Sequence, residues 1–255
     1  MKSLRPSLLF VVSIISISVI AQDLPSIQTD RPDQTEAATI VPTGYVQLET
    51  GFNSEQNDAV TKTLVYPTIL AKYGVNDRFE WRLILNYNSV ETGGERTSGV
   101  LPLSAGFKVA LWEQKGIIPK TSFIGHLTAP FIASKDFRNK HYSSDFRFTL
   151  SNQVTDHLSI GYNLGAAWDG NTGEPEFIYT LTAGYSFSDN WGAYIESFGF
   201  APHQRIPEHR ADGGLIFIPH PDFQVDISGG FGLSPNNKDY YYVSLGLSYR
   251  FKCKD

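Results

Sequence analysis

The stretch Leu158–Asp169, LSIGYNLGAAWD, decides the fold class of this chain. Its even positions carry apolar or aromatic side chains, and its odd positions carry small or polar ones. Because successive side chains of a β-strand point to opposite faces, this stretch predicts a strand between two different environments. The same alternation recurs at 79–88, 177–187 and 241–251. The sequence therefore predicts an all-β protein whose strands have one apolar and one polar face.

Working outward from these strands, we expect about twelve strands in the chain. Their predicted ranges are 44–55, 60–73, 78–89, 98–112, 120–131, 142–154, 157–168, 176–187, 190–201, 208–219, 222–232 and 238–251. The connections alternate in length. Short turns are predicted at 75–77, 155–156, 188–189 and 219–221, with a modest one at 113–119. Longer polar loops are predicted near 90–97, 132–141, 169–175, 202–207 and 233–237.

An even strand number with short turns on one rim and longer loops on the other is typical of a bacterial outer-membrane barrel. We therefore predict a transmembrane, antiparallel, up-and-down β-barrel of about twelve strands. After residue 21 no run of 18 apolar residues occurs, which excludes a membrane protein built from helices. A secreted β-sandwich is the alternative. It fits less well because the polar faces here are rich in Gly, Ser, Thr and Asn, whereas the apolar faces carry aromatic rings at strand ends.

Composition excludes several classes of protein. The 255 residues include 21 Lys and Arg against 26 Asp and Glu, too few basic residues for a nucleic-acid surface. The single cysteine, Cys253, excludes a disulfide framework and any metal site built from several cysteines. The sequence contains no GxSxG, HExxH or Walker A motif and no GxGxxG after a strand. We therefore expect no catalytic residues, no cofactor and no metal.

The N-terminus predicts export. Lys2 and Arg5 precede an apolar run, Leu8–Ile20, that ends before the small residue Ala21, the pattern of a cleaved signal peptide. We expect a signal peptide at 1–21, a polar leader at 22–43, an outer-membrane barrel at 44–251 and a short periplasmic tail at 252–255. The expected partners are outer-membrane lipid, the barrel-assembly machinery and a small solute, in a Gram-negative cell.

The polar strand faces carry charges of both signs. Continuing the alternation through every strand predicts that eleven charged residues point into the barrel: Glu49, Lys72, Glu80, Arg82, Lys108, Asp145, Arg147, Glu196, Asp212, Asp226 and Arg250. Isolated charges in a confined interior are costly, so we expect them to form ion pairs and to retain water. They either fill a narrow barrel as a structural network or set the selectivity of a solute path.

The leader contains TDRPDQTE at 29–36. Two interpretations remain open. The leader is a disordered periplasmic segment, or Asp30, Arg31, Asp33 and Glu36 fold into the barrel and pair with its charges as a small plug.

Histidines are the other candidates for chemistry. His126, His157 or His209 could join a Ser and an Asp in an outer-membrane lipase or protease, although hydrogen bonding at the surface or in the lumen is the simpler interpretation. His203 and His209 lie in or beside one loop with Arg205, Glu208 and Arg210, and could bind an anion or a metal, or be solvated loop residues. Cys253 is interpreted as incidental.

Several segments also resemble a known family. They are TDRPDQTE (29–36), VPTGYVQLETGF (41–52), YPTILAKYGVNDRFEWRL (66–83), GFKVALW (106–112), FSDNWGAYIE (187–196) and RADGGLIFIPHPDFQVDISGGFGL (210–233). In order and spacing they resemble the outer-membrane transporter family named after the meta-pathway of phenol degradation, which is well represented in Bacteroidota. The resemblance runs from Thr29 to Phe251 and implies a porin-like outer-membrane β-barrel. Lys72 stands where the family has Arg, and the residues after Phe251 are a second departure.

From these observations we expect a passive transporter or porin-like channel for a small solute, an aromatic or other hydrophobic compound being one candidate. A structural or adhesive barrel with a sealed lumen is the main alternative, and a lipid-modifying enzyme a weaker one.

Overall fold

The structure is a computed structural model that describes residues 24–203 and 205–253. The predicted signal peptide at 1–21 lies outside the described residues. Within them the chain forms β-strands and two short 3-10 helices, and neither helix has the length or apolar character needed to cross a membrane. The elements are β1 (Tyr45–Gln56), β2 (Thr61–Asn76), β3 (Phe79–Thr92), β4 (Glu95–Val100), β5 (Leu103–Trp112), β6 (Lys120–Ala129), η1 (Lys135–Phe137), β7 (Ser143–Gln153), β8 (Leu158–Trp168), β9 (Pro175–Ser186), β10 (Trp191–Pro202), β11 (Glu208–His220), β12 (Phe223–Gly232), η2 (Pro235–Asn237) and β13 (Tyr241–Lys252).

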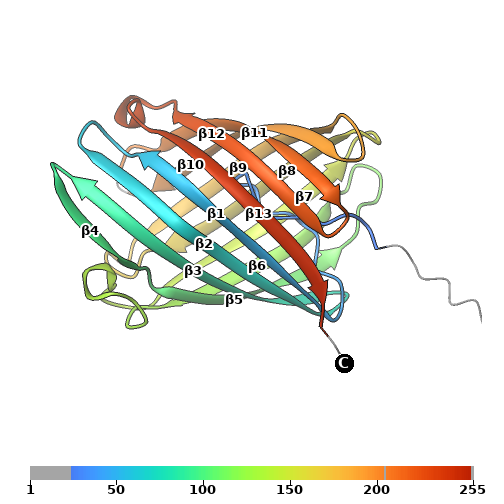
Figure 1. Cartoon of the computed structure of the whole chain (residues 1–255), viewed down its shortest axis with the longest axis horizontal. Helices are drawn as coiled ribbons and strands as arrows, with labels where there is room; N and C mark the ends of the chain where they lie inside the picture. Colours follow the sequence, from blue (N-terminus) through green and yellow to red (C-terminus); the bar gives the residue numbers. More distant parts are fainter. Residues whose placement is uncertain (1–23, 204, 254–255) are drawn as a thin grey trace, which may run out of the picture.

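The strands form one closed antiparallel barrel (Figure 1). Consecutive strands pair, except that β3 pairs with both β4 and β5, and β1 pairs with β13 from Tyr45↔Lys252 to Gln56↔Tyr241. This last pairing leaves the sheet without a free edge, which a membrane requires because lipid cannot satisfy unpaired backbone groups. The predicted fold class, an up-and-down barrel of twelve strands, is confirmed.

One predicted strand is divided in two. The sequence predicts a single strand at 98–112, but β4 ends at Val100 and β5 begins at Leu103. Pro102 lies at the break, and a proline has no N–H to donate to a neighbouring strand. β4 pairs with the end of β3 and β5 with its beginning, so the two segments occupy one position in the wall. Thirteen strand segments therefore make twelve barrel strands.

The predicted loop near 90–97 is wrong. β3 continues to Thr92, β4 begins at Glu95, and only Gly93 and Gly94 connect them. Both glycines have positive φ, 60° and 89°, the backbone geometry of a tight two-residue hairpin turn. The polar composition of this stretch conceals two paired strand ends. The last strand also begins later than predicted, at Tyr241 rather than 238, because η2 and the residues after it form the connection.

Burial is inverted relative to a water-soluble protein. Large apolar side chains face outward, for example Ile195 (71% exposed) and Leu164 (59%), whereas their neighbours Glu196 (4%) and Asn163 (0%) are buried inside. Outward rings also contact one another across strands, as in Phe79–Phe107 and Phe123–Phe146. An apolar outer surface around a polar interior is the arrangement that a bilayer stabilises.

The two rims of the barrel differ. At one rim short turns such as Asp77-Arg78 and Pro221-Asp222 connect the strands, and both ends of the barrel chain, Tyr45 and Lys252, lie there. The opposite rim carries the longer connections, including 130–142 and 233–240. In barrels of this kind the short turns face the periplasm. We call the first rim the turn rim and the second the loop rim.

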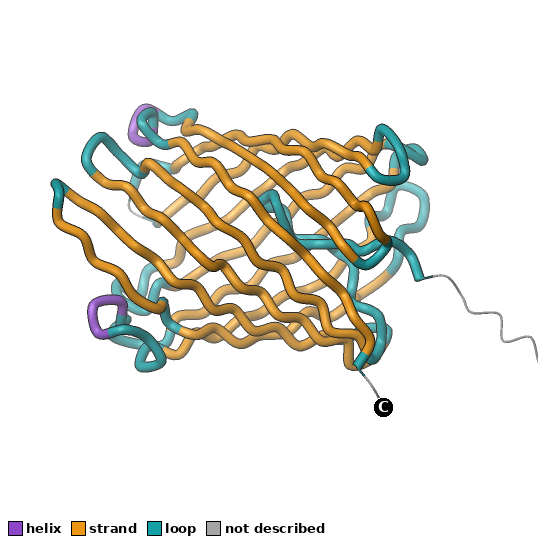
Figure 2. The backbone as a smooth tube through the Cα atoms, viewed as in Figure 1, coloured by secondary structure: helices purple, strands orange, loops and turns teal. Residues whose placement is uncertain are grey.

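Much of the described segment before β1, from 24 to 43, lies inside the barrel. Figure 2 shows this segment as a stretch of loop that enters at the turn rim and runs within the ring of strands. The leader therefore occupies part of the lumen, and its contacts with the wall define the candidate site.

Candidate functional site

The leader, described from 24 to 43, is an irregular segment held by the barrel wall. It contains prolines at 25, 32 and 42, which lack the N–H that regular structure requires. Its other backbone groups need partners, because a buried unpaired N–H or C=O is costly. The wall supplies them. Backbone N–H groups of the leader donate to wall side chains in the following pairs: Asp30 to Glu49, Gln34 to Glu196, Glu36 to Asn163 and Val41 to Glu80.

Leader carbonyls are bonded in the same way. They accept hydrogen bonds in the following pairs: Pro25 from Arg250, Gln28 from Gln47, Gln34 from Arg147, Ala37 from Lys108 and Ala38 from Ser122. Six of the eleven predicted lumen charges thus bind the leader backbone: Glu49, Glu80, Lys108, Arg147, Glu196 and Arg250. The polar inner faces of the strands serve largely as hydrogen-bonding partners for one internal segment.

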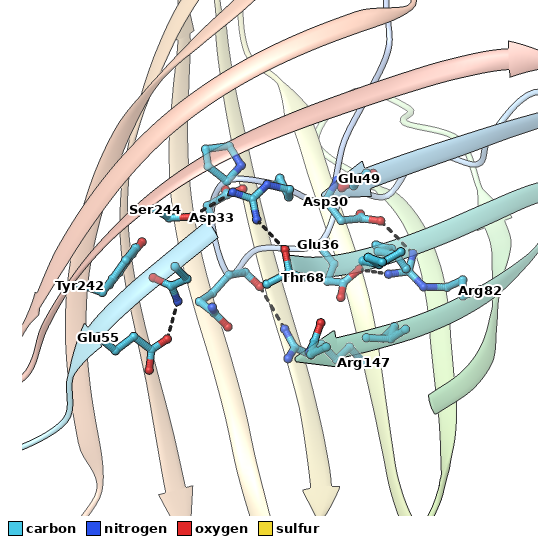
Figure 3. A pocket seen from close by; sticks show the side chains of 18 of the residues that line it. Asp30, Asp33, Glu36, Glu49, Glu55, Thr68, Arg82, Arg147, Tyr242 and Ser244 are labelled. Atoms are coloured by element: carbon cyan, nitrogen blue, oxygen red, sulfur yellow. Dashed lines mark hydrogen bonds and ion pairs between the residues drawn. The ribbon is translucent and has the colours of Figure 1, made fainter. Parts of the chain in front are cut away.

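Asp30 is the centre of the first cluster (Figure 3). One carboxylate oxygen lies 2.8 Å from Lys72 Nζ and 2.8 Å from Arg82 Nη1, and the other lies 3.0 Å from Lys108 Nζ. Burial alone would raise the pKa of Asp30. Lys108, Lys72 and Arg82 together outweigh burial and hold the pKa well below its ordinary value. Asp30 is therefore an ionised anchor for the leader.

Three further acids surround these three cations, which makes four carboxylates with Asp30. Glu49 pairs with Lys72, and Glu80 lies 3.0 Å from Arg82 Nη1. The leader contributes a second acid, Glu36, whose carboxylate lies 2.6 Å from Arg82 Nη2. We call this group, on β1, β2, β3 and β5, the cationic wall. Buried charges of this kind persist when each has a partner, and this group meets that condition.

His126 extends the cationic wall to β6. Its Nε2 accepts a hydrogen bond from Arg82 Nε at 3.1 Å, and its Nδ1 lies 3.0 Å from Asp145 Oδ1. Both ring nitrogens are thus engaged by charged side chains. In the described residues the ring makes no hydrogen bond to a hydroxyl, so the predicted alternative of a Ser–His–acid site receives no geometric support at this histidine.

Arg31 anchors the next turn of the leader. Its Nη2 lies 3.1 Å from Asp226 Oδ1 and 2.9 Å from Ser244 Oγ. The guanidinium lies over Gly51 and Gly246, which are paired on β1 and β13. A Cβ atom on Gly246 would lie 2.2 Å from Arg31 Nε, so the missing side chains make the room that the guanidinium occupies.

The leader meets a different surface at β9, β10 and β11. Thr35 donates to Glu196 Oε1 and lies 2.6 Å from the Thr180 hydroxyl. Asp212 lies opposite Glu196 in the strand register and accepts a hydrogen bond from Tyr242. We call Glu196 and Asp212 the acidic wall, because no Lys or Arg of the described residues forms a salt bridge with either carboxylate.

Asp33 of the leader faces the acidic wall. Burial raises its pKa well above the ordinary value, and Glu196 and Asp212 raise it further. In the described chain Asp212 Oδ1 and the Tyr194 hydroxyl have no hydrogen-bond partner. A carboxyl pressed against two others resists ionisation, so this contact favours the protonated form of Asp33.

The leader divides the lumen into two cavities. The outer cavity, of about 300 Å³, opens toward the loop rim and includes Asn53, Glu55 and Tyr240 in its lining. The inner cavity, of about 630 Å³, opens toward the turn rim and includes Gln114 and Asn190. A common set of leader residues lines both cavities: Arg31, Asp33 and Glu36. This short stretch is the partition between the two ends.

The structure places all eleven predicted lumen charges on the inner side of the wall. Nine of them are buried, and Asp145 and Arg147 are partly exposed. It also brings the four candidate plug residues into the barrel. Sequence reasoning missed several neutral partners that lie on the same faces: Gln47, Ser122, Asn163, Gln224 and Ser244. The period-two pattern places these residues on the inner face as well, but only charged residues were selected from it as candidates.

The residues of the predicted histidine loop lie away from the leader, at or near the loop rim. His203 Nδ1 lies 3.3 Å from Glu174, His209 contacts the Tyr179 hydroxyl, and Arg210 pairs with Glu208. Among the residues that the structure describes, no group of three or more His, Cys, Asp or Glu side chains is arranged to hold a metal ion. Cys253 lies just after β13, where its N–H donates to the Gly44 carbonyl.

Comparison with protein families identifies the sequence. Residues 29–251 match the family described as "Putative MetA-pathway of phenol degradation". The chain belongs to this family. The resemblance expected from the six sequence segments is thereby confirmed. No curated protein matches the chain.

Solved structures confirm the fold at low sequence identity. An outer-membrane channel from Pseudomonas putida F1 superposes with a TM-score of 0.69 at 13% identity, covering 87% of this chain and 99% of that one. The NanC porin gives 0.52 at 11% identity, covering 79% and 98%. The KdgM porin, crystallised with disordered oligogalacturonate, gives 0.52 at 10%, covering 80% and 99%.

Proposed function

We propose that the protein is a passive outer-membrane channel for a small polar solute, with its leader as the constriction. The observation that carries this is the pair of cavities, one toward each rim, which share the leader residues Arg31, Asp33 and Glu36 in their linings. A barrel of twelve strands lies between eight-stranded barrels, which side chains fill, and the wider aqueous porins. The similar solved structures, a channel and two porins, support the same function.

The lining favours polar solutes over hydrophobic ones. Both cavities contain carboxylates, guanidinium groups, amides and hydroxyls, including Asp33, Glu36 and Arg31, beside apolar side chains such as Ile69 and Ile160. A hydrophobic solute would displace water from these groups without replacing their hydrogen bonds. Movement would follow the concentration gradient. Residues 1–21 export the chain in this proposal, and no step of it requires catalysis.

The contacts of the leader decide how the channel would work. Ion pairs through Asp30, Arg31 and Glu36 hold it to strands β2, β12 and β3 of the wall. We therefore propose that the leader stays seated during ordinary passage and that solutes pass beside the stretch 31–36. A plug that leaves the barrel would have to break all of these pairs at once.

The test is single-channel conductance in planar bilayers. The refolded mature chain is compared with a variant lacking residues 22–36, after heat-modifiable gel migration has shown that both are folded. Openings in the mature chain, widened by the deletion, support a constricted channel. Openings only in the deletion variant make the leader a full plug. Silence in both overturns the channel function and favours the alternative of a sealed structural or adhesive barrel.

A further inference from the structure

The outer cavity contains a cation that the leader network leaves without a carboxylate. Arg147, on β7, donates from Nη1 to the Gln34 carbonyl at 3.0 Å, and no carboxylate of the described residues forms a salt bridge with it. Its nearest acid along the strand, Asp145, is engaged by His126. A partly exposed guanidinium with free N–H groups is suited to binding a carboxylate in a planar, two-bond arrangement.

The same cavity contains a carboxylate without a cation. Glu55, on β1, accepts hydrogen bonds from the amides of Asn53 and Asn57, and no Lys or Arg of the described chain forms a salt bridge with it. Arg210, which acts on it from a distance, is paired with Glu208 and stacked on the Tyr240 ring. Beside Glu55, the buried Oδ1 of Asn53 has no hydrogen-bond partner. The Glu55 carboxylate and Asn53 Oδ1 are thus both available to accept hydrogen bonds from one donor group of a solute.

These two charges come from separated parts of the wall. Between β1 and β7 lie β2, β3, the β4/β5 strand and β6, so the two strands stand well apart around the ring of twelve. Figure 3 shows Glu55 and Arg147 projecting toward the cavity from different strands, with Tyr242 beside Glu55. Tyr242 is the register partner of Glu55 on β13, and Tyr240 also lines the cavity. A tyrosine ring beside a carboxylate, as Tyr242 is beside Glu55, favours an ammonium group, which gains both the ion pair and a cation–π contact.

We propose that the outer cavity binds a small aminocarboxylate, its ammonium group at Glu55 and Asn53 and its carboxylate at Arg147. The proposal rests on the channel function, because it names the class of solute that the channel admits. A solute with one charge would satisfy only one side, and an uncharged solute neither. A cavity of about 300 Å³ lies at the lower end of the size of small-molecule sites, which fits a solute of this kind.

The test measures binding to the folded full mature chain in detergent, independently of conductance. Titration calorimetry is run with glycine, γ-aminobutyrate and ε-aminocaproate, which separate the two charges by increasing lengths. Methylammonium, acetate and a neutral polyol are the comparison solutes. We expect one aminocarboxylate to bind at least tenfold more tightly than either singly charged ion, since each charge-assisted contact contributes at least that factor.

Variants then test which side chain binds each end of the solute. Glu55→Gln and Arg147→Gln should each weaken binding of the best aminocarboxylate about tenfold or more, while Arg147→Lys should retain part of it. Exposed charges near the loop rim, changed in Glu91→Gln and Arg138→Gln, are the matched controls and should leave binding unaltered. Retained gel migration shows that each variant is folded.

Other outcomes overturn the proposal. Equal binding of acetate and aminocarboxylates, insensitive to Glu55→Gln, would identify an anion site only. Preference for methylammonium, insensitive to Arg147→Gln, would identify a cation site only. A protein that conducts but binds no aminocarboxylate would retain the channel function and lose this inference. A silent protein that binds one would retain the site and lose the channel.

Discussion

The cationic wall and the acidic wall hold the same leader by different interactions. At the cationic wall Asp30 meets Lys72, Arg82 and Lys108 at ion-pair distances. At the acidic wall, three residues further along, Asp33 meets only other carboxylates and hydroxyls. The pKa values of the two aspartates are accordingly shifted in opposite directions, downward for Asp30 and upward for Asp33. One aspartate anchors the leader by being charged, and the other can remain in place only by being neutral.

This difference gives the constriction one fixed side and one adjustable side. A carboxylate that retains its charge holds its partners over a wide pH range. A carboxyl that must stay protonated loosens when a proton is removed. The segment that separates the two cavities lies between these sides, so its position can respond to conditions without the leader leaving the barrel.

The largest expected effect is that of Asp30→Asn. The substitution leaves three buried cations with one acid fewer, and removing one partner from a buried ionic network typically costs about 3–5 kcal/mol. We expect a lower thermal unfolding midpoint in detergent and faster cleavage of the Glu36–Ala37 bond by a glutamate-specific protease. Asp33→Asn is the matched control, with the same chemical change in the same segment. It should leave both measurements unaltered or slightly improved. Equal losses in the two variants would remove the distinction between the walls.

The second prediction concerns pH. The pKa of Asp33 is raised in the seated leader, so its contact with the acidic wall is stable when protonated and weakens as pH rises above the ordinary value of about 4. Between the two pKa values each pH unit shifts the seating equilibrium about tenfold. The groups that face Asp33 are Thr182 on β9, Glu196 and Tyr194 on β10 and Asp212 on β11, with Arg147 on β7 bonded to the next residue.

Asp30 contributes in the opposite sense. Its lowered pKa means that its stabilisation is present above about pH 4 and is lost only as the pH falls toward the lowered value. Protease cleavage at Glu36–Ala37 should therefore rise from pH 5 to pH 9 in the native chain, with a flatter profile in Asp33→Asn. A peptide with the same sequence corrects for the protease itself. If both proteins show the same slope, Asp33 is not the titrating group.

A smaller effect is expected from Gly246→Ala. The new Cβ would occupy the place of the Arg31 guanidinium, which is the movable end of a long side chain. We expect Arg31 to leave Asp226 and the leader to loosen by about 1–3 kcal/mol, while the barrel stays folded. Gly125→Ala is the control, because its Cβ would meet only outward rings, with Phe107 at 3.3 Å. Conductance should change in the first variant alone, and an unchanged trace would mean that the seat of Arg31 does not position the constriction.

The sequence was sufficient to predict which residues face the inside of the barrel. It was insufficient to predict which groups those residues contact. Alternation is a local property, so Glu80 and Arg82 could be assigned to the inner face without knowledge of any other strand. The contact of Asp30 with Lys108 joins residues far apart in the chain, and it depends on the path of a segment without periodicity. For the same reason the two walls could not be distinguished. Which inner charges would meet a cation was fixed by the register around the barrel and by the leader between them.

The smallest effect is expected at the acidic wall, from Thr35→Val. The hydroxyl of Thr35 contacts both Glu196 and Thr180, and its replacement by a methyl group of similar size removes these contacts without adding a charge. The loss should be about 0.5–1.5 kcal/mol, the ordinary contribution of a hydrogen bond. If hydroxyls hold the leader to the acidic wall, Thr35→Val will raise Glu36–Ala37 cleavage at every pH and leave its pH slope intact. A variant that instead flattens the slope would show that Thr35 acts through the ionisation of the carboxyl groups, because only then would its loss alter the response to pH.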